Sequence, residues 1–261
     1  MGLWKSPARE FRQDVTLDGV LHGKVVIVTG GGAGIGEATA LFFSEQGAKV
    51  AVLDRNGDSA RRTAERCQGL ALQADMRDRT SLAAAVERTL SHYGRIDVLV
   101  NNAGIYPRQA FVDITEEQWD EMHDVNLKGT FRMCQLVAPH MIRQRAGKII
   151  NISSVTFFLG VRLLSHYVAA KGGVIGLTRV LAKELGEFNI HVNCITPGAI
   201  QTESEKFFVT EEQARAFVES QSLKRRLQPL DIARVCAFLA SSWSDGMTGQ
   251  TVNVDGGWVL Y

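Results

Sequence analysis

Apolar residues follow two alternating periods along almost the whole chain. Short runs rich in Val, Ile and Leu, the pattern of strands buried on both faces, occur at residues 24–30, 49–54, 70–76, 96–104, 148–154, 191–198 and 250–257. Helical spacing separates them, at residues 36–48, 58–69, 79–94, 115–145, in the second half of 149–178, and at 231–241. This alternation predicts a parallel sheet of about seven strands with helices on both faces.

No linker, repeat or shift of composition divides this pattern. We therefore expect one domain over residues 23–261, preceded by an N-terminal extension at 1–22. Inside the domain, residues 201–226 are too many for a plain connection. Thr210 and Gln213 form a capping-box pattern before apolar residues at helical spacing, which predicts an amphipathic helix and a flap over a substrate.

Composition and charge exclude several kinds of protein. The 261 residues carry a net charge of +1, which gives no reason to expect a nucleic-acid partner. The four cysteines are widely separated and the histidines have no metal-ligand spacing, so we expect reduced thiols, a cytoplasmic location and no metal site. No apolar run reaches the roughly 18 residues of a membrane helix, and we expect no membrane association.

A glycine-rich loop joins the first strand to the first helix. The segment "VTGGGAGIG" places Gly30, Gly34 and Gly36 where the positive end of a helix favours a pyrophosphate. Glycines alone fit a tight turn equally well. Asp54, at the end of the second strand, favours the ligand, because a carboxylate there accepts hydrogen bonds from a ribose 2′-hydroxyl and repels a 2′-phosphate.

Other strand ends lie at the same predicted edge, where open α/β sheets bind ligands. Asp75 and Met76 end the third strand, at a place suited to an adenine. Asn102, Ala103 and Gly104 follow the fourth, where small and amide residues allow a close backbone approach. Asn and Gly also make plain turns, so "NNAG" alone is weak support.

Tyr167 and Lys171 are four residues apart on a predicted helix and therefore share one face. A nearby cation lowers the pKa of a phenol, which would let Tyr167 exchange a proton with an alcohol or carbonyl near neutral pH. Ser154, thirteen residues before Tyr167, would hydrogen-bond the same oxygen. Alone, the Tyr–Lys pair is better explained as ordinary packing. Together with the glycine loop and Asp54 it predicts an active site.

These motifs together resemble the short-chain dehydrogenase/reductase family. From Lys24 to Gly257 the chain contains, in the family's order, "TGGGAGIG", "ADM", "NNAG", "VNLKGTF", "NISS", "YVAAK", "PGAIQT" and "GQTVNVDGG". The resemblance implies a single-domain Rossmann fold, a doubly wound parallel sheet, and a nicotinamide dinucleotide cofactor. It also implies a homotetramer or homodimer and a catalytic tetrad, matched here by Asn126, Ser154, Tyr167 and Lys171.

The resemblance further assigns roles around the cofactor. In the family the lysine also holds the nicotinamide ribose and the asparagine supports a proton-relay water. Together with the acidic residue at the end of the second strand, the resemblance predicts the residues that contact the cofactor. They are Gly30, Gly34, Ile35, Gly36, Asp54, Arg55, Asp75, Met76, Asn102, Ala103, Gly104, Tyr167, Lys171, Pro197, Gly198, Ile200 and Thr202. The N-terminal extension and the segment "TFFLGVRLLSH" depart from the family pattern.

We therefore expect an NAD(H)-dependent oxidoreductase that interconverts a secondary alcohol and a ketone, with Tyr167 as general acid and base. An NADPH-dependent ketoacyl-type reductase is the alternative, and it would need a basic residue at the glycine loop or in place of Asp54. A non-catalytic dinucleotide-binding sensor is the third reading, and it predicts a depleted tetrad.

The substrate side is predicted from bulky residues. Tyr106, Phe157, Phe158 and Leu164, with Phe207 and Phe208 before the flap helix, predict largely apolar walls. The substrate would then have a hydrophobic body. Alternatively, Arg108 or Arg162 anchors a carboxylate, although a solvated arginine is the commoner case. The sequence does not name the substrate.

Overall fold

The computed structural model describes residues 19–203, 205 and 209–260. Its strands form one sheet in the order β3-β2-β1-β4-β5-β6-β7, and every neighbouring pair is parallel. The strands are β1 (Val25–Thr29), β2 (Lys49–Asp54), β3 (Leu70–Gln73), β4 (Val98–Asn101), β5 (Gly147–Ile152), β6 (Ile190–Pro197) and β7 (Thr251–Val254). The predicted doubly wound sheet is confirmed.

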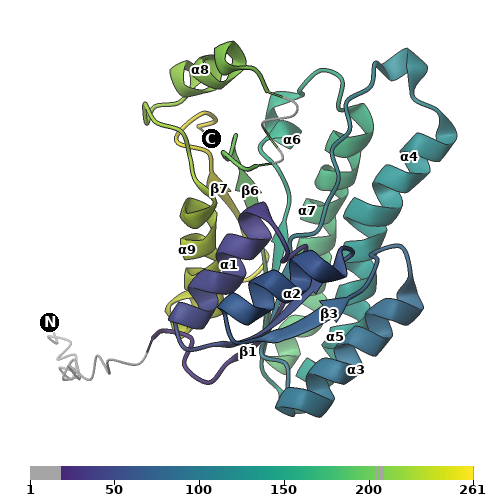
Figure 1. Ribbon diagram of the computed structural model, residues 1–261, viewed down its shortest axis with the longest axis vertical. Helices are drawn as coiled ribbons and strands as arrows, with labels where there is room; N and C mark the ends of the chain where they lie inside the picture. Colours follow the sequence, from purple (N-terminus) through teal and green to yellow (C-terminus); the bar gives the residue numbers. More distant parts are fainter. Residues whose placement is uncertain (1–18, 204, 206–208, 261) are drawn as a thin grey trace, which may run out of the picture.

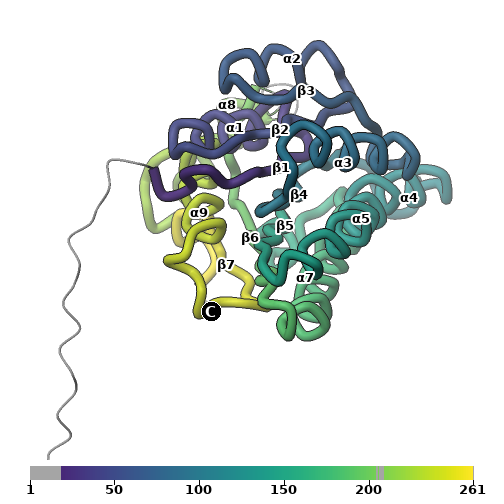
Figure 2. Tube along the Cα trace, turned by 90° about the horizontal axis from the view of Figure 1, so that it is seen from below, coloured from purple at the N-terminus to yellow at the C-terminus, as the bar shows by residue number. Residues whose placement is uncertain are grey.

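Helices cover both faces of the sheet (Figures 1 and 2): α1 and α9 lie on one face, and α3, α5 and α7 on the other. The α-helices are α1 (Gly34–Glu45), α2 (Gly57–Arg66), α3 (Arg79–Tyr93), α4 (Glu116–His123), α5 (Gly129–Gln144), α6 (Thr156–Leu159), α7 (Ser165–Leu185), α8 (Glu211–Ser220) and α9 (Pro229–Ala240). None of the helices in the described ranges is long and apolar enough to cross a membrane.

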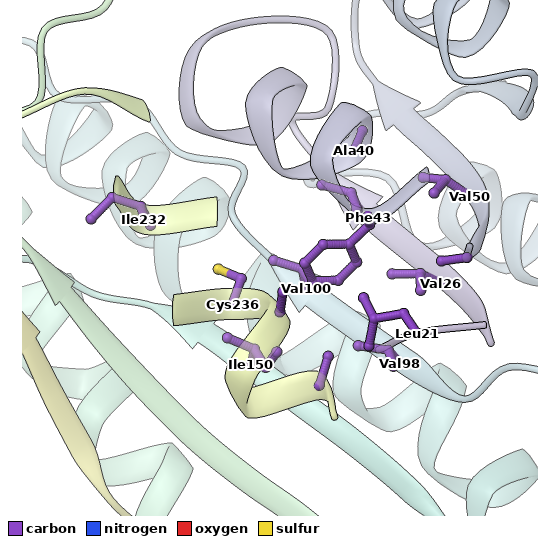
Figure 3. Close-up of a cluster of buried hydrophobic side chains, with 14 of the residues drawn as sticks. Leu21, Val26, Ala40, Phe43, Val50, Val98, Val100, Ile150, Ile232 and Cys236 are labelled. Carbon is purple, nitrogen blue, oxygen red and sulfur yellow. The ribbon is translucent and has the colours of Figure 1, made fainter. Parts of the chain in front are cut away.

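The core consists of two layers, one on each face of the sheet. Val26 and Val28 pack on the side of α1 and α9, whereas Ile27 between them packs on the side of α3 and α5. This alternation follows from the period of two in a strand. Figure 3 shows the first layer, with Phe43 of α1 among side chains of the central strands. Burial on both faces explains why the strands are continuous apolar runs.

The predicted N-terminal extension falls largely outside the described residues. Of its last residues, Leu21 is fully buried in the first core layer, and its backbone N–H donates to the carbonyl of Gln46. Residues 207 and 208, predicted to lie upstream of the flap helix, are also outside the described ranges.

The long helix predicted at residues 115–145 is interrupted. It begins with the predicted capping box of Thr115 and Gln118, runs as α4, and changes to a π-helical turn at Asp124–Lys128 before α5 continues. The wider turn contains Asn126. Helical periodicity does not distinguish an α-turn from a π-turn of this length, so the sequence pattern gave no sign of the interruption.

Candidate active site

The carboxyl ends of the central strands surround a cavity of about 520 Å³. It lies where β1 and β4 are neighbours and successive connections leave in opposite directions, which is where doubly wound sheets bind ligands. Within the described residues its lining includes most of the predicted cofactor contacts, namely Gly30, Gly34, Ile35, Asp54, Asn102, Ala103, Gly104, Tyr167, Lys171, Pro197, Gly198, Ile200 and Thr202.

The glycine loop brings backbone close to backbone. Gly30 has a φ of +61°, and a Cβ there would lie 2.8 Å from the Cα of Ala103. At Gly36 a Cβ would lie 2.0 Å from the carbonyl oxygen of Gly30, so this glycine is needed for packing α1 against the loop. Ala33 at the N-cap gives α1 no side-chain cap. The first N–H groups of α1 are therefore available for an anion, and the loop fits a pyrophosphate.

Asp54 is fixed at the end of β2 by two backbone donors. Its Oδ2 accepts from the N–H of Gly32 at 3.0 Å and its Oδ1 from the N–H of Asn56 at 2.9 Å, and the residue lines the cavity. This position suits a ribose hydroxyl. The neighbouring Arg55 is exposed and lines a separate polar hollow beside Arg61, so its predicted contact with the cofactor stays a prediction.

The turn after β4 is held by a residue that the sequence analysis missed. The hydroxyl of Thr29, at the end of β1, accepts from the N–H groups of Asn102 and Ala103 at 3.0 and 3.1 Å. In return, Nδ2 of Asn102 donates to the carbonyls of Thr29 and Gly30. The amide of Asn102 thus joins the end of β4 to the glycine loop. The part that Thr29 plays was missed because a threonine at the end of a buried strand has no distinguishing sequence signal.

The end of β3 pairs with the end of β2, but the residues that follow it turn away from the cavity lining that the described residues form. Among the described residues that line the cavity, neither Asp75 nor Met76 occurs. Asp75 pairs with Arg77 at 2.7 Å, and this hydrogen-bonded arginine lowers the pKa of its carboxyl. Met76 is buried beneath Gly129 of α5. The predicted contact of both residues with an adenine stays a prediction.

Ser154, two residues after β5, and Tyr167 of α7 both line the cavity. The hydroxyl of Ser154 accepts from the N–H and the hydroxyl of Thr156 at 3.2 and 3.0 Å, which fixes its direction. Ser153, by contrast, donates its hydroxyl to the carbonyl of Lys171 at 2.8 Å and braces α7. The geometry therefore favours Ser154 over Ser153 as the serine that contacts a substrate.

Lys171 lies beneath the tyrosine. Its Nζ is 5.7 Å from the centroid of the Tyr167 ring and donates to the carbonyl of Ile152 at 2.8 Å. The side chain is buried, and burial lowers its pKa to about 8. Burial likewise raises the pKa of Tyr167 to about 12, partly opposed by hydrogen bonding to Ser154. The expected lowering of the phenol pKa is wrong for this structure, because desolvation of the buried hydroxyl dominates the shift.

Asn126, in the π-helical turn, lies near Lys171 of α7. It is fully buried: its Oδ1 accepts from the N–H of Ile105 at 3.1 Å, and its Nδ2 donates to the same residue's carbonyl at 2.9 Å. A Cβ on Gly104 would lie 2.5 Å from Oδ1 of Asn126 and 3.4 Å from Nζ of Lys171. Gly104 therefore lets the asparagine and the lysine approach each other, and all four predicted tetrad members meet at one edge.

The substrate side is walled by apolar side chains from distant segments. Within the described residues these include Tyr106, Leu159, Val161, Leu164, Val209, Phe217 and Trp258. The rings of Tyr106 and Tyr167 meet edge to face, with centroids 6.3 Å apart. Phe157 and Phe158, which were predicted to be walls, belong to the single turn of α6 and are 43% and 37% exposed. Neither is in the lining that the described residues form.

The helix predicted within residues 201–226 is present as α8, with the predicted capping box of Thr210 and Gln213, and its role as a flap stays a prediction. Phe217 turns toward the cavity and packs against Trp258 of the C-terminal segment, with ring centroids 5.4 Å apart. Figure 1 shows α8 and this segment together at one end of the molecule. The sequence analysis missed Trp258. Its place depends on the buried Asp255, whose carboxylate accepts from three backbone N–H groups, including that of Trp258.

The chain is similar to known proteins over most of its length. Residues 30–259 match the family described as Enoyl-(Acyl carrier protein) reductase. The chain is 44% identical to "Probable galactose dehydrogenase GalD" of Rhizobium meliloti, over 91% of this chain and 95% of that protein. It is 42% identical to "3-oxoacyl-[acyl-carrier-protein] reductase FabG" of Thermotoga maritima (92% and 99%). It is also 36% identical to "2-dehydro-3-deoxy-D-gluconate 5-dehydrogenase" of Dickeya dadantii (92% and 96%).

The fold and the site define an oxidoreductase of the nicotinamide-dependent α/β class. The chain belongs to the short-chain dehydrogenase/reductase family.

Proposed function

We propose that the protein is an NAD(H)-dependent dehydrogenase that interconverts a secondary alcohol and a ketone. One observation carries the proposal: Ser154, Tyr167 and Lys171 line the same cavity as the glycine loop and Asp54. An active site that uses a dinucleotide needs both parts in one space. A non-catalytic sensor needs only the dinucleotide-binding loop and Asp54, so the presence of all four tetrad residues favours an enzyme over a sensor.

The side chains divide the chemistry among them. The bound nicotinamide would supply or accept the hydride. The hydroxyl of Tyr167 would donate a proton to the carbonyl oxygen during reduction and take it back during oxidation. Ser154 would hydrogen-bond the same oxygen and fix its position. Lys171 would bind the nicotinamide ribose, and Asn126 would hold the backbone beside it.

NAD(H) should be preferred over NADP(H) by at least about tenfold in kcat/KM, which corresponds to about 1.4 kcal/mol. The reason is the carboxylate of Asp54 at the cavity edge, which would repel a 2′-phosphate. Steady-state kinetics with both cofactors measures this ratio.

Asp54→Asn is the matched variant for this prediction, because it removes the charge and keeps an oxygen for the N–H of Gly32. We expect the ratio to fall toward one in this variant. Equal or better use of NADP(H) by the unchanged protein would instead support the ketoacyl-type reductase, the second candidate, which the 42% identity to an acyl-carrier-protein reductase favours.

The substrate should be a secondary alcohol with a hydrophobic body, because the walls around Tyr167 are largely apolar. A panel of NAD-linked oxidations tests this. It contains alkyl and ring alcohols, D-galactose, and the sugar acid named for the Dickeya relative, with a 3-oxoacyl thioester in the reverse direction. We expect alcohols with a hydrophobic body to give a higher kcat/KM than free sugars. A free sugar as best substrate would contradict the apolar pocket.

The predicted homotetramer or homodimer stays a prediction. Phe111, Val112 and Val180 are large apolar side chains with 72%, 85% and 53% exposure. Exposed apolar residues of this kind support a contact between copies of the chain.

A further inference from the structure

Among the described residues, one charged side chain of the cavity lining makes no hydrogen bond or ion pair. Within the described residues the charged members of the lining are Asp54, Arg108, Lys171 and Glu205. Asp54 accepts from backbone N–H groups, Lys171 donates to a carbonyl of β5, and both carboxylate oxygens of Glu205 accept from Arg226 at 2.6 Å. Across the described residues, the guanidinium of Arg108 has no hydrogen bond or ion pair.

The backbone before Arg108 is stiff and directs the side chain into the cavity. Pro107 has a fixed φ and restricts Tyr106 to extended conformations. In an extended segment, alternate side chains point to the same side. Accordingly, Tyr106 and Arg108 both line the cavity, and Pro107 is not in the lining that the described residues form. Arg108 is exposed, so its guanidinium is also accessible from solvent. The next residue, Gln109, anchors the segment by donating its N–H to the carbonyl of Leu163 at 2.9 Å.

Arg108 is also close to the reacting group. Its Cα lies at most about 7 Å from that of Tyr106 along an extended chain, and the ring of Tyr106 packs edge-on against Tyr167 with centroids 6.3 Å apart. One small molecule can therefore touch the hydroxyl of Tyr167 and the guanidinium together.

We propose that Arg108 binds a carboxylate of the substrate, so that the substrate is a hydroxy acid and the product an oxo acid. This rests on the proposed function. An arginine presents a planar pair of N–H donors that matches the two oxygens of a carboxylate. The other cations of the site are engaged: Lys171 with a backbone carbonyl, and Arg226 with Glu205. In the oxidation the carbinol carbon loses a hydride to NAD⁺ and the hydroxyl loses a proton to Tyr167, while the carboxylate keeps its charge.

The experiment compares hydroxy acids, with two to five carbons between hydroxyl and carboxylate, with their neutral methyl esters. We expect the best acid to exceed its ester at least tenfold in kcat/KM. Arg108→Ala should remove this difference through a higher KM for the acid and leave the ester unchanged, and Arg108→Lys should restore part of it. Arg162→Ala is the control, because Arg162 is exposed nearby and lies outside the lining formed by the described residues. Arg162→Ala should leave kcat/KM unchanged for both the acid and the ester.

Equal use of acid and ester would overturn the proposal, and so would an equal loss for both in Arg108→Ala, which would show a structural role. A hydroxyalkyl phosphate of the same chain length is tested beside the acid. If the phosphate is preferred, a carboxylate subsite is excluded. Calorimetric titration with the oxo acid separates this proposal from the proposed function. If the protein oxidises no alcohol but binds the oxo acid at least tenfold more tightly than Arg108→Ala does, the carboxylate subsite is supported and the proposed dehydrogenase function is contradicted. If the protein oxidises neutral alcohols but shows no such binding, the proposed function is supported and the subsite is contradicted.

Discussion

Tyr167→Phe should lower kcat in both directions by about 10²- to 10⁴-fold, the range that a positioned acid or base contributes. The change removes one hydroxyl and almost no volume, so the cavity and its cofactor edge stay intact. The dissociation constant for NADH, measured by fluorescence titration, should therefore remain close to that of the unchanged protein. A variant that keeps more than a few per cent of the activity would contradict the role of Tyr167.

Tyr106→Phe is the matched control, because Tyr106 lines the same cavity and stacks edge-on against Tyr167. It loses the same hydroxyl and should keep most of the turnover. The pH dependence gives a second readout. Burial raises the pKa of Tyr167, so the phenol is protonated at neutral pH and ready to donate. Reduction should therefore be nearly constant through neutral pH, whereas kcat/KM for oxidation should rise as pH increases. An oxidation rate that falls with rising pH would point to another base.

The fold was predictable because each strand is buried on both faces. Continuous apolar runs such as residues 25–29 then differ sharply from the helical spacing around them. The predicted edge followed for the same reason: in a parallel sheet all carboxyl ends meet, so Asp54, Asn102 and Ser154 come together although they are far apart in sequence.

What could not be predicted depends on contacts between distant segments. Trp258 reaches the cavity only because Asp255 holds the tail and Phe217 of the flap packs against the ring. Phe157 lies with its ring against Gly172 of α7 and outside the cavity lining that the described residues form, a contact that the sequence does not reveal. The direction of the Tyr167 pKa shift also required the structure, because burial raises the pKa and hydrogen bonding to Ser154 lowers it, and only the three-dimensional packing decides between them.

Lys171→Met should abolish useful turnover and at the same time stabilise the cofactor-free protein. The lysine is buried with its Nζ donating to one carbonyl, that of Ile152. Burial lowers its pKa from 10.5 to about 8, which corresponds to a cost of about 3 kcal/mol for holding the charge in the folded state. Methionine has a similar length and no charge. Part of the gain is lost with the hydrogen bond, about 1 kcal/mol, so we expect a rise in Tm of a few degrees.

The pH dependence of this gain has a definite sign. Below pH 8 the lysine is charged in both the folded and the unfolded chain, and the full cost is present. Between pH 8 and 10.5 the unfolded chain binds more protons than the folded one, so the unchanged protein gains stability as pH rises. The advantage of Lys171→Met should therefore shrink over this range in thermal unfolding. Lys148→Met is the control: its Nζ pairs with Asp245 at 2.7 Å, and its loss should bring no stabilisation. The opposite result would be a Lys171→Met protein with a lower Tm at pH 7 and a Tm that changes with pH in the same way as that of the unchanged protein up to pH 10.5. It would show that burying the charged lysine does not destabilise the fold.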